Sequence, residues 1–202
     1  MKSSARGAAI MIAFAVVFTG LMAVVYGLTK TIVQANEDHA RLALITQVLP
    51  AGSYDNNLLA DVKTVTDPAL GDGEHHVYLA RKSGKVVAVV AEATAPDGYS
   101  GAIDILVGVF AQGDIAGVRV VKHKETPGLG DYIEIAKSEW IRIFDGKSLK
   151  APSEQGWAVK KDGGEFTHMA GATISPRAVV KATHRTLNYV EAHKAEWLGE
   201  QR

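Results

Sequence analysis

The feature that most constrains the fold is an uncharged apolar stretch close to the N-terminus. It covers residues 8–28 and reads AAIMIAFAVVFTGLMAVVYGL. A helix needs about 20 apolar residues to cross the roughly 30 Å hydrocarbon core of a bilayer, and this stretch is long enough. We therefore predict one transmembrane helix over residues 8–28.

Charges on either side of this stretch predict its orientation. Lys2 and Arg6 precede it, whereas the positive charge that follows it is balanced by acidic residues. Positively charged flanks favour the cytoplasmic side, so residues 1–7 are expected in the cytoplasm and the rest of the chain outside. The alternative is a cleaved signal peptide with a poor cleavage site at residues 33–35, but its apolar core of about 7–15 residues would be shorter.

A helical stalk is expected between the membrane and the remainder of the chain. Asn36 can cap a helix whose apolar stripe reaches Val48, and Pro50 stops that helix. This assigns residues 29–50 to the stalk. Residues 51–73 mix Gly, Asn, Asp and Pro without periodicity, which predicts a loop with short elements.

Four segments further along the chain have the composition and spacing of β-strands. They are residues 76–80, 86–94, 103–110 and 115–121, and short turns join them in pairs. Two hairpins predict an antiparallel sheet, and an amphipathic segment that starts at Pro176 predicts a helix to cover it. The expected fold class is α+β, an antiparallel sheet of hairpins covered by helices, in a domain over residues 51–202 that follows one transmembrane helix.

Composition excludes several classes of function. Lys and Arg together number 22, as do Asp and Glu, so no basic surplus indicates a nucleic-acid partner. The lack of Cys removes disulfides, thiolate nucleophiles and cysteine-ligated metals. His75 and His76 would point to opposite faces of a strand, and His184 and His193 are too far apart on a helix to share a metal. We predict no metal site, and an organic cofactor for any redox role.

Two glycine-rich loops at strand ends form the first candidate ligand site. Residues 95–101 read APDGYSG and residues 123–131 read HKETPGLGD. Glycine lets the backbone approach a flat ligand, and Leu129 could project against an aromatic ring system. Turn formation is the more common explanation of each loop alone. Neither loop matches a phosphate loop, a dinucleotide fingerprint or a nucleophile elbow, so a hydrolase is not favoured.

The second candidate is the segment AGATISP at residues 170–176. Ser175 is expected to be the N-cap and Pro176 the first residue of the C-terminal helix. Thr173 would then lie just before the helix N-terminus, where free N–H groups and the helix dipole favour an anion such as a phosphate. That charge would offset the basic residues of the first turns, among them Arg177. A capped helix start with solvated basic residues explains the motif without a ligand.

Four segments follow one another after a basic N-terminus and a single predicted transmembrane helix; they read GYSGAIDILVGV, HKETPGLGDYIE, EWIRIF and AGATISPRAVVKA. In this order they resemble the FMN-binding G subunit of Rnf/Rsx-type ion-translocating electron transport complexes, which is related to the C subunit of the sodium-pumping NADH:quinone reductase. The resemblance covers nearly the whole chain. It implies a single-pass subunit of the bacterial inner membrane whose periplasmic flavin domain relays electrons between ferredoxin and NAD chemistry, in contact with other subunits of the complex.

The resemblance also implies a covalent cofactor. In the family a flavin transferase links FMN through its phosphate to the Thr of an S/T-G-A-T motif, which matches Thr173. The other residues implied to bind FMN are Gly171, Ala172, Ile174, Ser175 and Arg177 near the attachment point, Glu125, Thr126, Gly128 and Leu129 in the second loop, and Tyr99 and Ser100 in the first. The transferase pattern commonly has Asp six residues before the modified Thr and Ser or Thr three before it, where this chain has Thr167 and Ala170.

Two interpretations of the whole chain result. The first is an electron-transfer subunit with covalent FMN, in which no side chain is assigned as a general acid or base because the flavin does the redox chemistry. The second is a non-redox, membrane-anchored interaction or assembly module, in which AGATISP only starts a helix. The state of the Thr173 hydroxyl distinguishes them.

Overall fold

The structure is a computed structural model that describes residues 2–198, without the side chains of residues 2–5, 9, 37 and 38. The chain divides into two units, Met1–Arg41 and Leu42–Arg202. A single helix, α1, covers Lys2–Val48 and so belongs to both units. The prediction of a separate helix start at Asn36 is wrong, because no proline precedes Pro50 to interrupt the hydrogen bonds of the helix.

α1 carries the apolar stretch predicted to cross a membrane. The segment Arg6–Val48 contains a window with a mean hydropathy of 2.6. Its large apolar side chains, such as Phe14, Phe18 and Leu21, are exposed within this chain. Their burial therefore has to come from outside the chain, and by length and composition α1 can span a bilayer.

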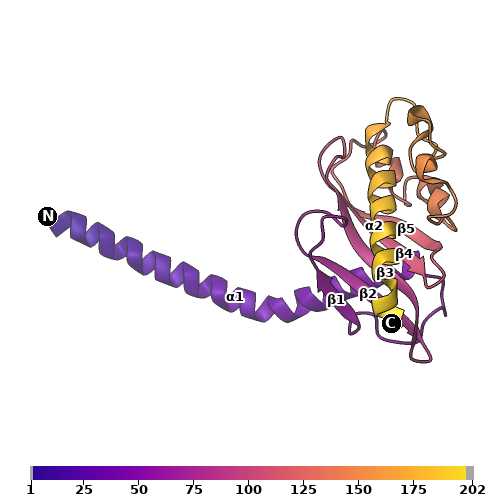
Figure 1. The fold of residues 1–202 in the computed structure, drawn as a ribbon. Coiled ribbons are helices and arrows are strands. Elements are labelled where there is room, and N and C mark those ends of the chain that lie inside the picture. Colours follow the sequence, from indigo (N-terminus) through magenta and orange to yellow (C-terminus); the bar gives the residue numbers. More distant parts are fainter. Residues whose placement is uncertain (1, 199–202) are drawn as a thin grey trace. The chain divides into compact units, whose positions relative to one another are not determined.

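The second unit is built on one antiparallel sheet with the strands in sequence order (Figure 1). The strands are β1 (Val62–Val65), β2 (His75–Lys82), β3 (Lys85–Ala95), β4 (Ile103–Phe110) and β5 (Ile115–Lys122). The two predicted hairpins, β2–β3 and β4–β5, are confirmed, and β3 also pairs with β4. β1 adds an edge strand inside the region expected to be mostly loop. The α+β fold class is confirmed.

One face of the sheet packs against α2, Ile174–Leu198, which lies across β3 and β4 (Figure 1). Alternate strand residues such as Val89 and Val107 point into this core, where Val179 and Leu187 of α2 meet them. The pattern follows from the two-residue period of a strand, which places every second side chain on the same face. The sheet thus fixes α2 along its length.

The last turns of α1 cover the opposite face of the sheet. Ile45 and Val48 are buried there, in contact with a cluster that includes Tyr78, Val90 and Leu106. These strand residues alternate with those that face α2, so both faces of the sheet are covered.

Two glycines make the contact of α1 with the sheet possible. Gly108 of β4 and Gly117 of β5 are directly paired across the strands. A Cβ atom on either residue would lie 3.0 Å from the carbonyl oxygen of Val48. The paired glycines therefore leave the space in which the backbone of the last turn of α1 lies, and we call them the glycine seat.

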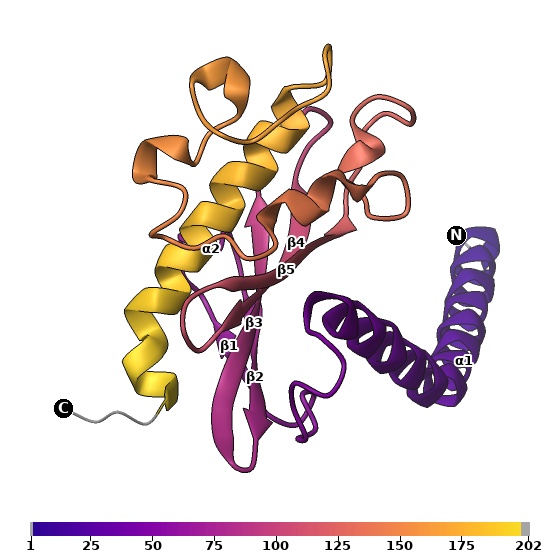
Figure 2. The same cartoon turned by 90° about the vertical axis from the view of Figure 1, so that its right-hand side faces the viewer.

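The segment between β5 and α2 forms four short 3-10 helices beside the N-terminal half of α2 (Figure 2). They are η1 (Asp131–Ile133), η2 (Glu139–Phe144), η3 (Glu154–Gly156) and η4 (Lys160–Asp162). Aromatic side chains hold this segment together: Phe144 and Trp157 both lie with their ring centroids 5.0 Å from that of Phe166. The segment ends in the loop that leads into α2.

Candidate functional site: the pocket at the start of α2

A pocket of about 210 Å³ opens at the N-terminus of α2, and we call it the α2 pocket. Three segments far apart in the sequence form it: the loop between β3 and β4, the loop after β5, and the start of α2. It is lined by Tyr99, Glu125, Thr126, Leu129, Gly130, Gly171, Ala172, Thr173, Ile174 and Ser175. The fold therefore brings both glycine-rich loops and the AGATISP segment to one place.

The helix begins earlier than the sequence predicted. α2 starts at Ile174, and the backbone N–H of Arg177 donates to the carbonyl of Thr173 at 3.2 Å, which is the first bond of the helix. Thr173 is therefore at the N-cap position. The assignment of Ser175 as N-cap and Pro176 as first helical residue is wrong, because Ser175 lies inside the first turn and its hydroxyl is used elsewhere.

Several hydrogen-bond donors remain open at this helix start. Among the described residues, neither the hydroxyl of Thr173 nor the backbone N–H groups of Ile174 and Ser175 have a hydrogen-bond acceptor. Pro176 has no N–H to offer. Open N–H groups together with the positive end of the helix dipole favour an anionic group at this position. Thr173 itself is partly exposed, so its hydroxyl is accessible.

A buried carboxylate joins the three segments. Glu125 is only 5% exposed. It accepts a hydrogen bond from the hydroxyl of Ser175 at 2.7 Å and another from the backbone N–H of Ser100 at 3.2 Å. Hydrogen bonds to a charged group are the stronger kind, at about 1.5–3 kcal/mol each. Glu125 therefore fixes both glycine-rich loops to the first turn of α2.

Gly130 allows the loop to close on this carboxylate. A Cβ at position 130 would lie 2.7 Å from Oε2 of Glu125 and 3.0 Å from the hydroxyl of Ser175. Any larger residue would push the pair apart. Gly130 could not be singled out from the sequence, because a loop pattern does not reveal which of its glycines meets a distant side chain.

His123 holds the backbone of Glu125 in place. The backbone N–H of Glu125 donates to Nδ1 of His123 at 2.9 Å, and Nε2 of the same ring lies 2.9 Å from Oε1 of Glu134. The ring thus joins the end of β5 to the region after η1. His123 could not be assigned to the site from the sequence, since only the contact with Glu134 distinguishes it from a surface histidine.

Large apolar side chains are exposed at the rim of the α2 pocket. Tyr99, Leu129 and Ile174 line it and are 69%, 54% and 42% exposed, respectively. Met169, just before the helix start, is 43% exposed. A soluble surface carries such groups together mainly where a ligand or partner covers them. The pocket thus combines polar donors at its helix end with an apolar rim, as ligand sites commonly do.

Three of the residues that the resemblance implied do not line the pocket. The side chain of Arg177 points to η4, where its Nη2 donates to Asp162 at 2.8 Å in a bidentate ion pair. The hydrogen bond from Arg177 lowers the pKa of Asp162 below its ordinary value. Ser100 contributes its backbone N–H to Glu125, and Gly128 donates its N–H to Asp131 at 2.8 Å.

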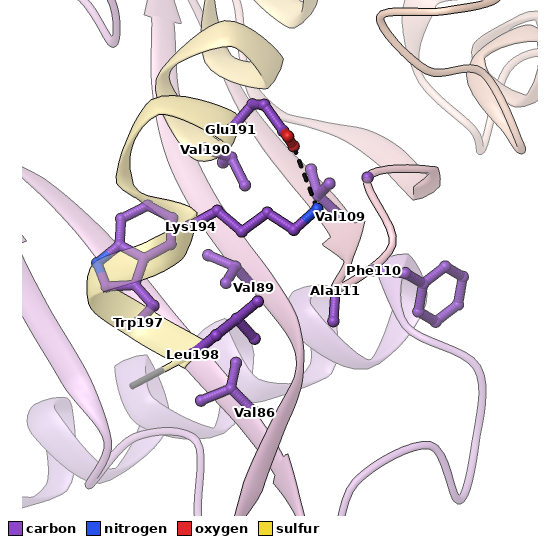
Figure 3. A pocket seen from close by; sticks show the side chains of 11 residues that line it. Val86, Val89, Val109, Phe110, Ala111, Val190, Glu191, Lys194, Trp197 and Leu198 are labelled. Carbon is purple, nitrogen blue, oxygen red and sulfur yellow. Dashed lines mark hydrogen bonds and ion pairs between the residues drawn. The ribbon is translucent and has the colours of Figure 1, made fainter. Parts of the chain in front are cut away.

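A second depression is too small to hold a ligand. It lies between the C-terminal half of α2 and strands β3 and β4, and mostly apolar side chains surround it (Figure 3). Its volume is about 10 Å³, the space of about one water molecule. Lys194 and Glu191 form an ion pair of 3.5 Å at its edge. Among the described residues, no group of three or more His, Asp or Glu is placed to hold a metal ion.

Comparison with known proteins gives the class of this chain. Residues 98–188 match the FMN-binding domain family, and residues 1–48 match the RnfG N-terminal region. Every residue that lines the α2 pocket falls inside the first match. These matches therefore place the α2 pocket in a domain of the FMN-binding family, which follows an apolar N-terminal helix.

Relatives that match almost the whole chain give the family. The chain is 50% identical over 202 residues to the G subunit of the ion-translocating oxidoreductase complex of Pseudomonas aeruginosa strain UCBPP-PA14, covering 99% of this chain and 94% of the relative. The G subunit of Escherichia coli strain K12 is 50% identical over 183 residues, 91% of this chain and 89% of the relative. That of Erwinia tasmaniensis is 50% identical over 179 residues, 88% and 85%. The chain belongs to the RnfG family, the G subunits of ion-translocating oxidoreductase complexes.

Proposed function

We propose that this chain is a membrane-anchored flavoprotein subunit that carries FMN covalently on Thr173 and relays electrons within an Rnf-type ferredoxin/NAD oxidoreductase complex coupled to ion translocation. The observation that carries the proposal is the partly exposed hydroxyl of Thr173 beside open N–H groups in the α2 pocket. The family match to an FMN-binding domain supports the identity of the cofactor.

The residues of the α2 pocket fit the two ends of FMN. The phosphate suits the open donors of Ile174 and Ser175 and the positive end of the α2 dipole. The apolar rim around Leu129 and Tyr99 suits a flat ring. Pockets for complete ligands measure about 300–1,000 Å³, so the α2 pocket of about 210 Å³ would enclose part of FMN, and the exposed rim would contact the rest.

Attachment requires one phosphoryl-transfer step at Thr173. Its Oγ1 would form a bond to the FMN phosphorus of a flavin dinucleotide held by a flavin transferase. The pyrophosphate P–O bond would break, the nucleoside monophosphate would leave with the bridging oxygen, and the hydroxyl proton would be released. A phosphodiester would remain, and its single negative charge would suit the N-terminus of α2.

The chain's own residues have binding and positioning roles. Bound FMN supplies the redox chemistry, which the protein tunes through contacts and exposure. Glu125 holds the loops that carry Leu129 and Tyr99 against the helix start through Ser175 and Ser100. No residue of this chain is proposed as a catalytic acid or base.

The membrane arrangement is part of the same proposal. Residues 1–7 would lie in the cytoplasm, residues 8–28 would cross the inner membrane, residues 29–50 would form a helical stalk, and residues 51–202 would form a periplasmic FMN-binding domain. The continuous apolar helix α1 and the basic residues before it support this arrangement.

Intact mass spectrometry tests the attachment. The full chain is co-expressed with a flavin transferase, and the wild type, Thr173→Val and Thr66→Val are compared. Thr66→Val is the matched control, because Thr66 is exposed and lies outside both the α2 pocket and the loop that precedes Thr173. We expect a mass gain of FMN less one water in the wild type and in the control, and none in Thr173→Val. A wild type without this gain, or a gain that persists in Thr173→Val, contradicts the proposal and favours the non-redox interaction module.

A further inference from the structure

The loop that carries the proposed attachment residue is held by a side chain from another element. Met169 and Ala172 close a turn just before Thr173, with the N–H of Ala172 donating to the carbonyl of Met169 at 3.1 Å. The hydroxyl of Tyr132 in η1 completes this turn: it accepts from the N–H of Met169 at 3.0 Å and donates to the carbonyl of Ala172 at 3.2 Å. Tyr132 thus bridges the two backbone groups that the turn leaves unpaired.

A second contact fixes the beginning of the same loop. The indole Nε1 of Trp140 in η2 donates to the carbonyl of Thr167 at 2.7 Å. The Trp140 ring meets the ring of Tyr132 edge to face at 5.5 Å, and the ring of buried Phe144 at 5.7 Å. The two side chains are therefore anchored in the aromatic core and hold the loop at both ends.

Burial keeps the Tyr132 hydroxyl in the form that this bridge needs. Tyr132 is 6% exposed. Its burial raises the pKa of the phenol above its ordinary value of 10.0, and the hydrogen bond from Met169 acts in the opposite sense. The hydroxyl therefore keeps the proton that it donates to Ala172 at neutral pH.

We propose that Tyr132, supported by Trp140, is a positioning residue for flavin attachment, because it holds residues 167–172 in the shape that presents the Thr173 hydroxyl to a flavin transferase. This inference rests on the proposed covalent attachment at Thr173. An attacking hydroxyl must be held in a narrow range of positions, and the cost of ordering it in advance is avoided during the reaction. Fixing the carbonyl of Ala172, one bond before Thr173, restricts the backbone from which that hydroxyl projects.

The test compares the rate of flavin transfer in matched variants of the full chain. Tyr132→Phe keeps the ring and removes only the bridging hydroxyl. Tyr189→Phe is the control, since Tyr189 is equally buried at 6% and its hydroxyl has no hydrogen bond to any described residue. We expect Tyr132→Phe to slow the mass gain roughly tenfold, the factor that corresponds to about 1.4 kcal/mol, and Tyr189→Phe to leave the rate unchanged.

Amide hydrogen exchange on the chain without flavin gives an independent readout. The Met169 amide is expected to exchange faster in Tyr132→Phe than in the wild type, and at the wild-type rate in Tyr189→Phe. If Tyr132→Phe does not fold, Trp140→Phe tests the other end of the loop through its contact with Thr167.

The outcomes separate this inference from the function on which it rests. A wild-type chain that gains no flavin mass overturns the proposed function, and this inference with it. A modified wild type together with an equally fast Tyr132→Phe overturns the inference alone. Equal slowing of Tyr132→Phe and Tyr189→Phe also overturns it, because the effect would then come from general destabilisation.

Discussion

The hydrogen bond between Ser175 and Glu125 gives the sharpest stability prediction. Ser175→Ala removes the hydroxyl that donates to Oε2 of Glu125 at 2.7 Å, and no other described residue donates to that oxygen. Glu125 is 5% exposed, so water can replace the lost donor only poorly. The loss is about 1.5–3 kcal/mol for a hydrogen bond to a charged group.

The higher helix propensity of alanine offsets part of this loss of stability. Ser175 lies in the first turn of α2, where replacing Ser by Ala favours the helix by roughly 0.5 kcal/mol. The net loss of unfolding free energy is therefore about 1–2.5 kcal/mol. For a domain of this size, each kcal/mol lowers the Tm by about 2–4 °C, so we expect a drop of roughly 2–10 °C.

Tryptophan fluorescence during thermal unfolding of the full, flavin-free chain in detergent measures this effect. The three tryptophans, Trp140, Trp157 and Trp197, all lie in the second unit. Ser153→Ala is the control, because Ser153 is exposed and makes no capping hydrogen bond, and its effect should stay within about 0.5 kcal/mol. A double-mutant cycle with Glu125→Gln should give a coupling of at least about 0.5 kcal/mol. Equal melting of both serine variants, or a coupling near zero, would refute the reasoning.

Two further predictions concern pH and packing. Burial lowers the pKa of His184 below its ordinary 6.5, with Glu154 acting in the opposite sense, so only the unfolded chain takes up the proton readily. The Tm should therefore be constant above pH 6.5 and decrease as the pH is lowered below 6.5. A His184→Gln variant should show a smaller decrease, and a Tm that rises on acidification contradicts this reasoning. Gly117→Ala places a Cβ 3.0 Å from the carbonyl oxygen of Val48 and should lower the free energy of unfolding by about 1–3 kcal/mol in the same melting assay. Gly27→Ala is the control, because Gly27 has open space around it and its replacement should not lower the Tm. Equal melting of the two variants excludes a steric role for the glycine seat.

The strands could be predicted because their signal is local. β4 covers Ile103–Phe110, the predicted range, since apolar residues dominate it and turns bound it on both sides. β1 could not be predicted, because two of its four residues are exposed, the other two are only half-buried, and no tight turn joins it to its partner β2. A short edge strand has too few residues to show a periodic pattern.

The first residue of α2 could not be predicted from local helix-capping rules. Ser followed by Pro is a common helix start, yet Thr173 has the same capping chemistry and lies two residues earlier. The choice depends on Glu125, which binds the Ser175 hydroxyl from 50 positions away in the chain. Gly130 and Tyr132 could not be predicted for a similar reason, because their contacts form only once the loop after β5 has folded against α2.

The contact between the last turns of α1 and the sheet determines where the chain can be truncated. A fragment that begins at residue 51 loses Ile45, Val48 and Leu49, which are at most 3% exposed, and leaves Tyr78 and Leu106 uncovered on a bare sheet face. Such a fragment is expected to aggregate through this face. A water-soluble version for crystallography or spectroscopy should therefore begin after the apolar stretch that ends at residue 28 and no later than Leu42, so that the end of α1 is kept as part of the domain.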